Sequence, residues 1–412
     1  MRITRRNFLQ AALAAPIGAS FAQYEALAAP ARGTVKITSV KAARFRGAGL
    51  VKIETDAGTT GYGPFFGTGP QARAAIAALE RRGAGLTGGD PLDIEVHFHN
   101  MFYSQPQRDR PIRIFSGIDI ALWDLAGKIL DQPVSKLLGG NFRDKLDLYS
   151  HCYSGNPRPR ADILSKEAWR IEAEKLKSDR RGFKAFKVDI HHALGVPSGR
   201  YAPTIGPKDA RRVHEVYTLA REALGEDIDI IVHCHNELDE PSAVRVAEAV
   251  EHIEPLFLED PLAPDFSEAW MALRRSTRVP LMTGENIELA EMAAPFLRNQ
   301  AVDYLQPDLV HSGGITGTKR IADLAALYRI PVCLHSPGDL ALTMASQQWS
   351  AAVFNCPLME CGRWVDESPL AASNAPEIEN GRMKVSTLPG IGLVLDHDYL
   401  KANLADGEPW WG

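Results

Sequence analysis

The spacing of apolar and polar positions changes along the chain and predicts two kinds of structure. From about Val35 to Pro64, short apolar runs alternate with turn residues, which is typical of an antiparallel meander. Helical spacing follows and is clearest from Gly117 to Asp131, where apolar residues recur every three or four positions before Pro133 ends the helix. We therefore expect an N-terminal α+β domain at residues 34–145.

After Leu146 strands alternate with helices, which is the pattern of parallel βαβ units. The candidate strands are 146–152, 183–189, 228–233, 256–258, 281–283, 304–306, 332–334 and 358–359. Eight such strands predict a closed barrel at residues 146–370. The Gly- and Pro-rich stretch 191–206 is expected at its mouth, and residues 371–412 are expected to pack back on the N-terminal domain.

Each apolar strand core ends in an ionisable residue or an amide. Gaps of 23 to 27 residues, about one βα unit each, separate His233, Glu259, Glu285, Asp308, His335 and Glu360. Because the C-terminal ends of barrel strands converge on one mouth, these side chains are expected to share one site with Lys187, His235 and Gln306. A single carboxylate at a strand end is usually a helix cap, but capping does not explain a recurrence at fixed register.

The first 28 residues have the organisation of a twin-arginine signal peptide. Thr4-Arg5-Arg6-Asn7-Phe8-Leu9-Gln10 precedes the apolar stretch from Ala11 to Ala22 and the small-residue site Ala26-Leu27-Ala28. The alternative is an amphipathic cytosolic leader. We expect export to the periplasm or the cell exterior as a soluble product without a membrane span.

Composition narrows the class of partner. Of the 412 residues 45% are hydrophobic and 24% charged, the net charge is −5, and Lys and Arg form no dense run. The basic surface that nucleic acids or anionic membranes require is therefore missing, and a small-molecule partner is expected. The five cysteines lack CxxC spacing, which favours buried thiols over disulfides or a zinc site.

Several motifs are spread over nearly the whole chain after the leader. They are Thr55-Asp56-Ala57-Gly58, Gly61-Tyr62-Gly63, Ser116-Gly117-Ile118-Asp119-Ile120-Ala121-Leu122-Trp123-Asp124, Leu137-Leu138-Gly139-Gly140, Leu258-Glu259-Asp260-Pro261, Gly284-Glu285 and Gln306-Pro307-Asp308. Together they resemble the mandelate racemase/muconate lactonizing group of the enolase superfamily. The stretch from Gln306 to Thr316, with His235, looks most like the acid-sugar dehydratases of the galactonate and mannonate kind.

The resemblance implies an α/β fold: a modified (β/α)7β TIM-like barrel with an α+β capping domain built from N- and C-terminal segments. It also implies a homo-oligomer and Mg²⁺ held at the ends of the third, fourth and fifth strands. Glu259 and Glu285 fill the last two positions, whereas His233 stands where the family carries Asp. We hypothesise that His233 still ligates the metal; the alternative is that it hydrogen-bonds a metal-bound water. An imidazole ligand would favour Mn²⁺ or another divalent metal over Mg²⁺.

The remaining strand-end residues are assigned catalytic roles. His335, paired with Asp308, is the expected general base, because the carboxylate fixes the imidazole tautomer. His235 is the expected general acid for the departing hydroxyl. Lys187 is interpreted as a ligand of the substrate carboxylate, and the resemblance implies that Glu360 hydrogen-bonds a substrate or enediolate oxygen.

The expected activity is that of a carbon-oxygen lyase that dehydrates a sugar acid by removing the proton next to the carboxylate and expelling a β-hydroxyl as water. Three alternatives remain: another β-elimination on uronate oligosaccharides, racemisation or epimerisation, and non-catalytic periplasmic binding of sugar acids. Asp189 argues against a racemase, because that group carries a second lysine where this chain has Asp189.

Overall fold

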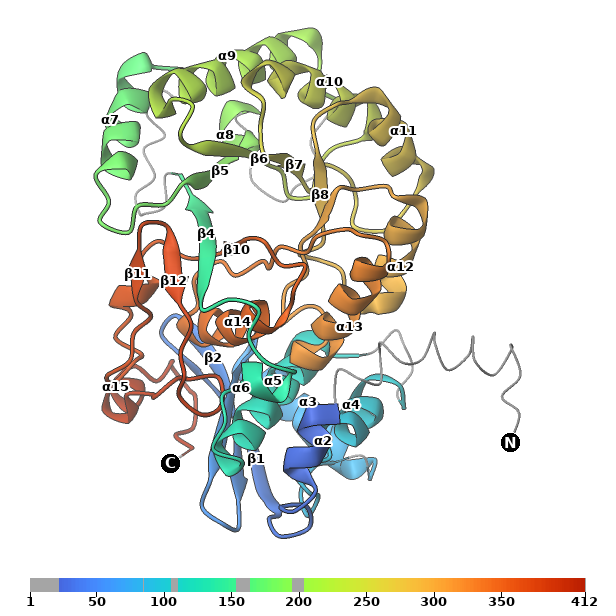
Figure 1. Cartoon of the computed structure of the whole chain (residues 1–412), viewed down its shortest axis with the longest axis vertical. Coiled ribbons are helices and arrows are strands. Elements are labelled where there is room, and N and C mark those ends of the chain that lie inside the picture. Colours follow the sequence, from blue (N-terminus) through green and yellow to red (C-terminus); the bar gives the residue numbers. More distant parts are fainter. Residues whose placement is uncertain (1–21, 84, 105–109, 153–163, 195–203, 412) are drawn as a thin grey trace.

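In the computed structural model the eight predicted strands form a closed parallel barrel (Figure 1). The structure describes residues 22–83, 85–104, 110–152, 164–194 and 204–411. The named strands of the barrel are β4 (Lys145–His151), β5 (Ala185–Asp189), β6 (Asp229–His233), β7 (Phe257–Glu259), β8 (Leu281–Thr283), β9 (Tyr304–Leu305) and β10 (Met359–Glu360). Strands β4 to β9 pair in chain order, and β10 pairs in parallel with β4. The predicted fold class is confirmed.

The seventh strand of the barrel, around Val332, is irregular. Around Val332 the chain pairs through isolated parallel bridges, Leu305 with Val332 and Leu334 with Met359. The Val332 N–H donates to the Asn355 carbonyl at 2.8 Å instead of to a neighbouring strand. This segment therefore occupies the seventh strand position of the barrel without forming a continuous ladder of hydrogen bonds.

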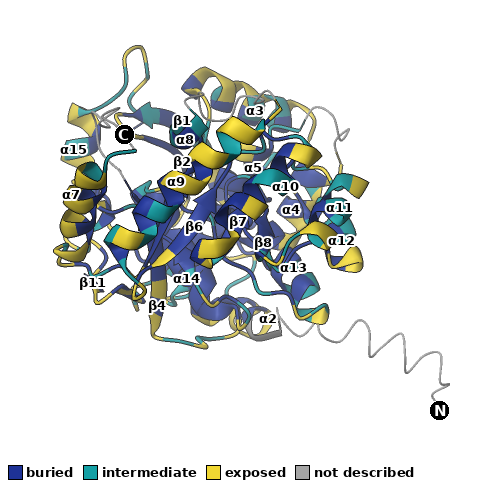
Figure 2. Ribbon diagram, turned by 90° about the horizontal axis from the view of Figure 1, so that it is seen from above, coloured by how far each residue is buried: buried dark blue, intermediate teal, exposed yellow. Residues whose placement is uncertain are grey.

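Helices surround the barrel strands, and most bury one face. They are α7 (Lys166–Lys177), α8 (Ile190–Leu194), α9 (Pro207–Leu224), α10 (Glu240–Val250), α11 (Glu268–Ser276), α12 (Ala290–Asn299), α13 (Gly314–Leu327) and α14 (Leu340–Ala352), with 3-10 turns η2 (Glu251–Ile253) and η3 (Val365–Glu367). In α7, for example, the Ser165 side chain caps the first turn, and Trp169, Ala173 and Leu176 face the barrel at three- and four-residue steps. Helix α14, in contrast, is buried on all sides. Figure 2 shows the strands buried inside a layer of helices with exposed outer faces.

The N-terminal domain is a three-stranded antiparallel meander covered by helices. Its elements are β1 (Ile37–Phe45), β2 (Ala48–Thr55), β3 (Thr60–Pro64), α3 (Gly69–Arg81), α4 (Ile94–Phe102), α5 (Ile112–Ile129) and α6 (Val134–Leu137). Strand β3 lies so close to α5 that a Cβ on Gly63 would be 2.0 Å from the Gly117 carbonyl oxygen. This close approach explains the glycines of the Gly61-Tyr62-Gly63 motif.

Helix α5 also holds this domain against the barrel. Asp119 Oδ2 accepts from the Thr316 N–H at 3.0 Å, and Trp123 Nε1 donates to Thr316 Oγ1 at 2.9 Å. Gly314 has φ +70°, and a Cβ there would lie 2.3 Å from Asp119 Oδ2. Two distant motifs, one on α5 and one at the start of α13, therefore form a single interdomain contact.

The C-terminal segment contacts both parts of the molecule. Strands β11 (Ile378–Glu379) and β12 (Arg382–Lys384) form a hairpin, and β12 pairs antiparallel with β4 of the barrel. Further on, the Ile391 N–H donates to Asp124 Oδ1 on α5 at 2.9 Å, and after α15 (His397–Ala402) the Trp411 ring lies 4.9 Å from that of Phe45.

Part of the predicted leader is packed against the N-terminal domain. Residues 1–21 lie outside the described residues, but α2 (Ala22–Ala28) is described. The Tyr24 side chain is buried, its hydroxyl donates to the Leu92 carbonyl, and its ring lies 5.2 Å from that of Trp123. Residues 195–203 of the predicted mouth loop also lie outside the described residues.

Two further findings concern the described part of the chain. All five cysteines are buried and free, so the prediction of buried thiols is confirmed. None of the helices described there is both long and apolar enough to cross a membrane.

Candidate active site

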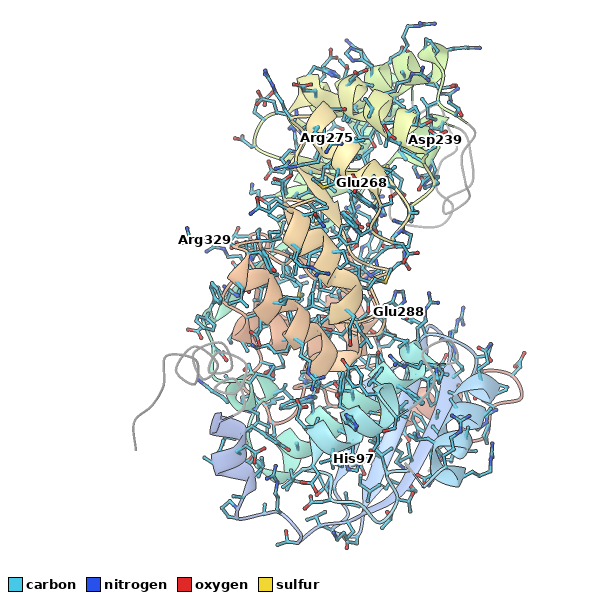
Figure 3. The ribbon with its side chains drawn as sticks, turned by 90° about the vertical axis from the view of Figure 1, so that its right-hand side faces the viewer. His97, Asp239, Glu268, Arg275, Glu288 and Arg329 are labelled. Carbon is cyan, nitrogen blue, oxygen red and sulfur yellow. The ribbon has the colours of Figure 1, made fainter. Side chains whose placement is uncertain are left out.

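Parallel register brings the polar strand ends to one mouth. Asp189 pairs with His233, His233 pairs with Glu259, and Asp308 forms a bridge with His335. In Figure 3, Asp239 and Glu288, in the loops that follow β6 and β8, lie toward one side of the barrel, and Arg329, after α13, lies toward the other. The strands' C-terminal ends therefore face the Asp239 and Glu288 side, as expected for a barrel active site.

The three predicted metal ligands lie together. His233, Glu259 and Glu285 each offer one ligand atom, and these atoms are within 4.8 Å of one another. His233 Nε2 lies 3.4 Å from Glu259 Oε1. His233 Nε2 and Glu259 Oε2 are both buried without a hydrogen-bond partner among the described residues. Such orphaned atoms are rare in folded proteins, and here they are ligand types that a divalent cation would satisfy.

The charge balance of this group also fits a cation. Burial raises the pKa of Glu259 above its ordinary value even though the Lys187 ammonium beside it acts in the opposite direction. Burial and the Lys187 charge lower the pKa of His233 to about 3, so this ring is neutral. Glu259 therefore lacks the nearby positive charge that would keep it ionised, and a dication would supply that charge.

Lys187 is enclosed by two carboxylates. Its side chain is fully buried, and Nζ donates to Glu259 Oε1 at 2.5 Å and to Glu360 Oε2 at 3.2 Å. Burial lowers the pKa of Lys187, but the charges of Glu259 and Glu360 outweigh that effect and leave it above its ordinary value. The ammonium therefore binds Glu259 Oε1 and makes no hydrogen bond to Oε2.

His335 and Asp308 form the predicted dyad. His335 Nδ1 lies 2.7 Å from Asp308 Oδ2, and Asp308 Oδ1 accepts from the Val310 N–H at 2.6 Å. The carboxylate can only accept, so it fixes the tautomer with a proton on Nδ1. His335 Nε2 then points into the site, 3.2 Å from Glu285 Oε2 and 3.8 Å from Glu360 Oε2.

The same carboxylates control the protonation of His335. Burial lowers its pKa, but the charges of Glu360 and Glu285 raise it to about 10. A proton acceptor must be neutral, so His335 can act as a base only where these carboxylates are compensated by positive charge. Lys187 compensates Glu360, and a cation on Glu285 would compensate the second carboxylate.

His235 lies on the flank of the group, with its ring 4.1 Å from that of His233. Its backbone N–H donates to the Glu237 carboxylate, whereas its side-chain Nδ1 is buried without a partner in the described part of the chain. Burial lowers the pKa of His235 below its ordinary value. The general-acid role of His235 stays a prediction.

Two residues of the site were not assigned to it from the sequence. His151, at the end of β4, lies 2.7 Å through Nε2 from Glu360 Oε1 and pairs in register with Lys187. Asp189 Oδ1 lies 2.5 Å from His233 Nδ1. Asp189 ends the predicted strand 183–189, and His151 is the last residue but one of the predicted strand 146–152. Examining the polar residues at the end of every predicted strand would therefore have found both.

The N-terminal domain reaches the rim of the site. The Phe66 ring, between β3 and α3, meets the His311 ring edge-on at 5.5 Å, and His311 Nδ1 is 2.7 Å from the Glu285 carbonyl oxygen. The capping domain is therefore linked through His311 to the segment that carries Glu285.

Comparisons with known proteins agree with this arrangement. Residues 24–139 match the mandelate racemase/muconate lactonizing enzyme N-terminal domain, and residues 170–399 match the enolase C-terminal domain-like family. A D-xylonate dehydratase of Haloferax volcanii is 34% identical over 374 residues, covering 87% of this chain and 86% of the relative. A D-mannonate dehydratase of a Sphingomonas species is 29% identical over 358 residues, covering 84% and 89%.

Solved structures give the same result. A mandelate racemase/muconate lactonizing enzyme from a Sulfitobacter species has a TM-score of 0.79 at 28% identity and covers 91% of this chain and 97% of its own. A mandelate racemase/muconate lactonizing enzyme-like protein from Rubrobacter xylanophilus has a TM-score of 0.79 at 30% identity and covers 92% and 99%. The chain therefore belongs to the mandelate racemase/muconate lactonizing enzyme family of the enolase superfamily.

Proposed function

We propose that the protein is an acid-sugar dehydratase, a hydro-lyase that removes the proton next to a carboxylate and expels a β-hydroxyl as water. The relatives named as xylonate and mannonate dehydratases support this reaction class. The observation that carries the proposal is that the His335–Asp308 dyad points Nε2 into the mouth that holds the His233, Glu259 and Glu285 group.

His233, Glu259 and Glu285 would hold a divalent cation, Mg²⁺ or Mn²⁺. When bound, the cation supplies positive charge to the substrate carboxylate oxygens, on which negative charge builds up as the neighbouring carbon loses its proton. A Lys or His base beside a divalent ion is the general arrangement in enolase-type sites, and His335 beside this group of ligands fits it.

The chain's own residues carry the proton transfers. His335 Nε2 accepts the α-proton, and Asp308 keeps the other ring proton on Nδ1 and stabilises the imidazolium that forms. The electron pair of the broken C–H bond first moves onto the substrate carboxylate, which gives an enediolate, and then forms the new C=C bond as the β-carbon–oxygen bond breaks. His235 protonates the departing hydroxyl, so the products are water and an enol that tautomerises to the 2-keto-3-deoxy acid.

The geometry gives no support to a racemase. A racemase needs a competent base on each face of the carbon, and the second strand could supply one from Lys187 or Asp189. Lys187 is fully buried between Glu259 and Glu360, and Asp189 is paired with His233. Neither is disposed to take a proton from the face opposite His335.

The reaction is tested by incubating the protein with aldonates and with uronate oligosaccharides in Mg²⁺ or Mn²⁺ and measuring 2-keto-3-deoxy acids. We expect product from a sugar acid and its loss on chelation. A product from oligosaccharides alone would indicate β-elimination at the glycosidic oxygen instead. Ligand-induced stabilisation without product, insensitive to metal, would indicate a binding protein and overturn the proposal.

We also propose that the protein meets its substrate outside the cytoplasm after export by the twin-arginine route. The Arg5-Arg6 pair and the apolar stretch that follows support this location. Replacement of both arginines by lysine is expected to keep the protein in the cytoplasm, as measured by cell fractionation. Export of this variant at the normal level would contradict the proposal.

A further inference from the structure

Asp189, the last residue of β5, contacts the proposed cation site. Asp189 Oδ1 lies 2.5 Å from His233 Nδ1, and the two residues are direct partners in the parallel register of β5 and β6. Both are buried, at 7% and 2% exposure. The contact therefore belongs to the interior of the barrel mouth and is not a surface ion pair.

This contact fixes which nitrogen of His233 is available. A carboxylate accepts hydrogen bonds and does not donate them, so His233 Nδ1 carries the proton and Nε2 carries the lone pair. Nε2 faces Glu259 Oε1 at 3.4 Å, and neither it nor Glu259 Oε2 has a hydrogen-bond partner in the part of the chain that is described. A lone pair directed at a carboxylate oxygen is repulsive unless a cation lies between them.

The second oxygen of Asp189 is also surrounded by imidazoles. Oδ2 lies 3.6 Å from His192 Nε2 and 3.9 Å from His191 Nδ1, both on α8. A ring nitrogen of His151, on β4, also lies within 4.8 Å of an Asp189 carboxylate oxygen and of a His233 ring nitrogen. The carboxylate is thus enclosed on several sides, which limits its rotation away from His233.

We propose that Asp189 is a positioning residue that holds His233 as a neutral Nε2 ligand, so that the site selects Mn²⁺ or a softer dication over Mg²⁺. The inference rests on the proposed cation site but not on the identity of the substrate. The negative charge that an aspartate ligand would carry is retained, one hydrogen bond farther from the ion. A carboxylate behind a histidine ligand raises the basicity of the imidazole and fixes its orientation.

Metal binding distinguishes a positioning role of Asp189 from a purely structural one. Loss of such an outer carboxylate typically weakens metal binding about 10- to 100-fold. The nitrogen ligand itself has a spectroscopic signature, because pulsed EPR of bound Mn²⁺ detects a directly coordinated ¹⁴N nucleus. A purely structural residue would move neither the affinity ratio between metals nor that signal.

The first measurement is pulsed EPR of bound Mn²⁺, and the wild-type signal alone can overturn the proposal. The full chain is loaded with Mn²⁺ alone, and the ¹⁴N modulation is recorded for the wild type, His233→Asp, His235→Asn and His335→Asn. We expect modulation in the wild type and in the last two variants, and its loss in His233→Asp. Absence of ¹⁴N modulation in the wild type, or its persistence in His233→Asp, would overturn the proposal.

The second measurement is a double-mutant cycle on metal affinity. Asp189→Asn is expected to weaken Mn²⁺ binding about 10- to 100-fold. His233→Asp places two carboxylates face to face, so it should bind Mg²⁺ more weakly than the Asp189→Asn/His233→Asp double variant, in which one carboxylate is left at the ligand position. The ratio of Mg²⁺ affinity to Mn²⁺ affinity should also be higher in the double variant than in the wild type.

Equal Mn²⁺-to-Mg²⁺ affinity ratios in all four proteins would contradict the inference. Thermal melts without metal check that each variant folds, and the wild-type EPR signal remains decisive where a variant does not. Failure of the dehydratase proposal is separate, since it would leave the EPR result intact while no sugar acid gives product.

Discussion

The Nε2 atom of His335 is the point at which the proposed chemistry begins, and its partners set its properties. Asp308 fixes the tautomer from behind, and Glu285 and Glu360 face the reactive nitrogen. General-base catalysis contributes about 10² to 10⁴ in rate. His335→Asn is therefore expected to lower kcat by about that factor with KM little changed, as measured by steady-state kinetics on the preferred sugar acid. His252→Asn, a histidine in η2 outside the site, serves as the matched control.

Asp119 gives a second prediction at the same scale. Burial raises the pKa of its carboxyl from the ordinary 3.8 to about 7, despite the Thr316 N–H that it accepts. The folded chain then binds a proton that the unfolded chain has already lost, so stability decreases as the pH rises from about 4 to 7. Asp119→Asn keeps the acceptor oxygen and removes the charge. Its free energy of unfolding relative to the wild type should improve by about 2 to 4 kcal/mol between pH 4 and pH 8 in urea titrations.

Asp119 is fully buried at the contact between the domains, which makes this pH dependence local. A relative stability of Asp119→Asn that is the same at both pH values would show that folding does not raise the pKa of this carboxyl. The strand-end histidines and carboxylates are unchanged in this variant, so their titration cancels in the comparison.

At the scale of elements, helix α2 places a constraint on processing of the leader. Tyr24 and Ala28 are buried on the N-terminal domain, and the family match begins at residue 24. Cleavage after Ala28 would remove this helix, whereas cleavage after Ser20-Phe21-Ala22 would retain it. A chain that starts at Ala29 should be less stable than one that starts at Gln23 by about 2 to 5 kcal/mol, because a buried aromatic side chain is lost.

Mass spectrometry of the exported protein locates the mature N-terminus directly, and Tyr24→Ala in the longer chain isolates the side-chain contribution. Equal thermal stability of the two chains would show that α2 adds nothing to the folded domain. Helix α2 would then place no constraint on the boundary predicted at residue 28.

The positions of the barrel strands could be predicted from the sequence, whereas the contact between the two domains could not. Strand positions were predictable because short apolar runs recur at intervals of about one βα unit and each ends in a polar residue. The seventh strand was found by the same pattern, yet the Val332 N–H bonds outside the sheet and leaves only isolated bridges there. The contact between Asp119 and Thr316 was not predicted, because 197 positions separate them and no periodicity links the two helices.

At the scale of the whole molecule, closure of the barrel converts a pattern along the chain into a site. His233, Glu259 and Glu285 were expected to meet, and their ligand atoms lie within 4.8 Å of one another. Spacing cannot reveal which partner each side chain chooses. The contact of Asp189 with His233 and the enclosure of Lys187 by Glu259 and Glu360 depend on the register of neighbouring strands, which only the closed barrel defines.

Exchange of the proton next to the carboxylate gives the most direct test of the proposed reaction. The sugar acid that gives product is incubated in deuterated buffer with the wild type, His335→Asn and His235→Asn, and exchange at the α-carbon is followed by NMR in substrate and product. We expect His335→Asn to abolish exchange, whereas His235→Asn should retain exchange and lose elimination. Exchange at the wild-type rate in both variants would contradict the assignment of His335 as the base.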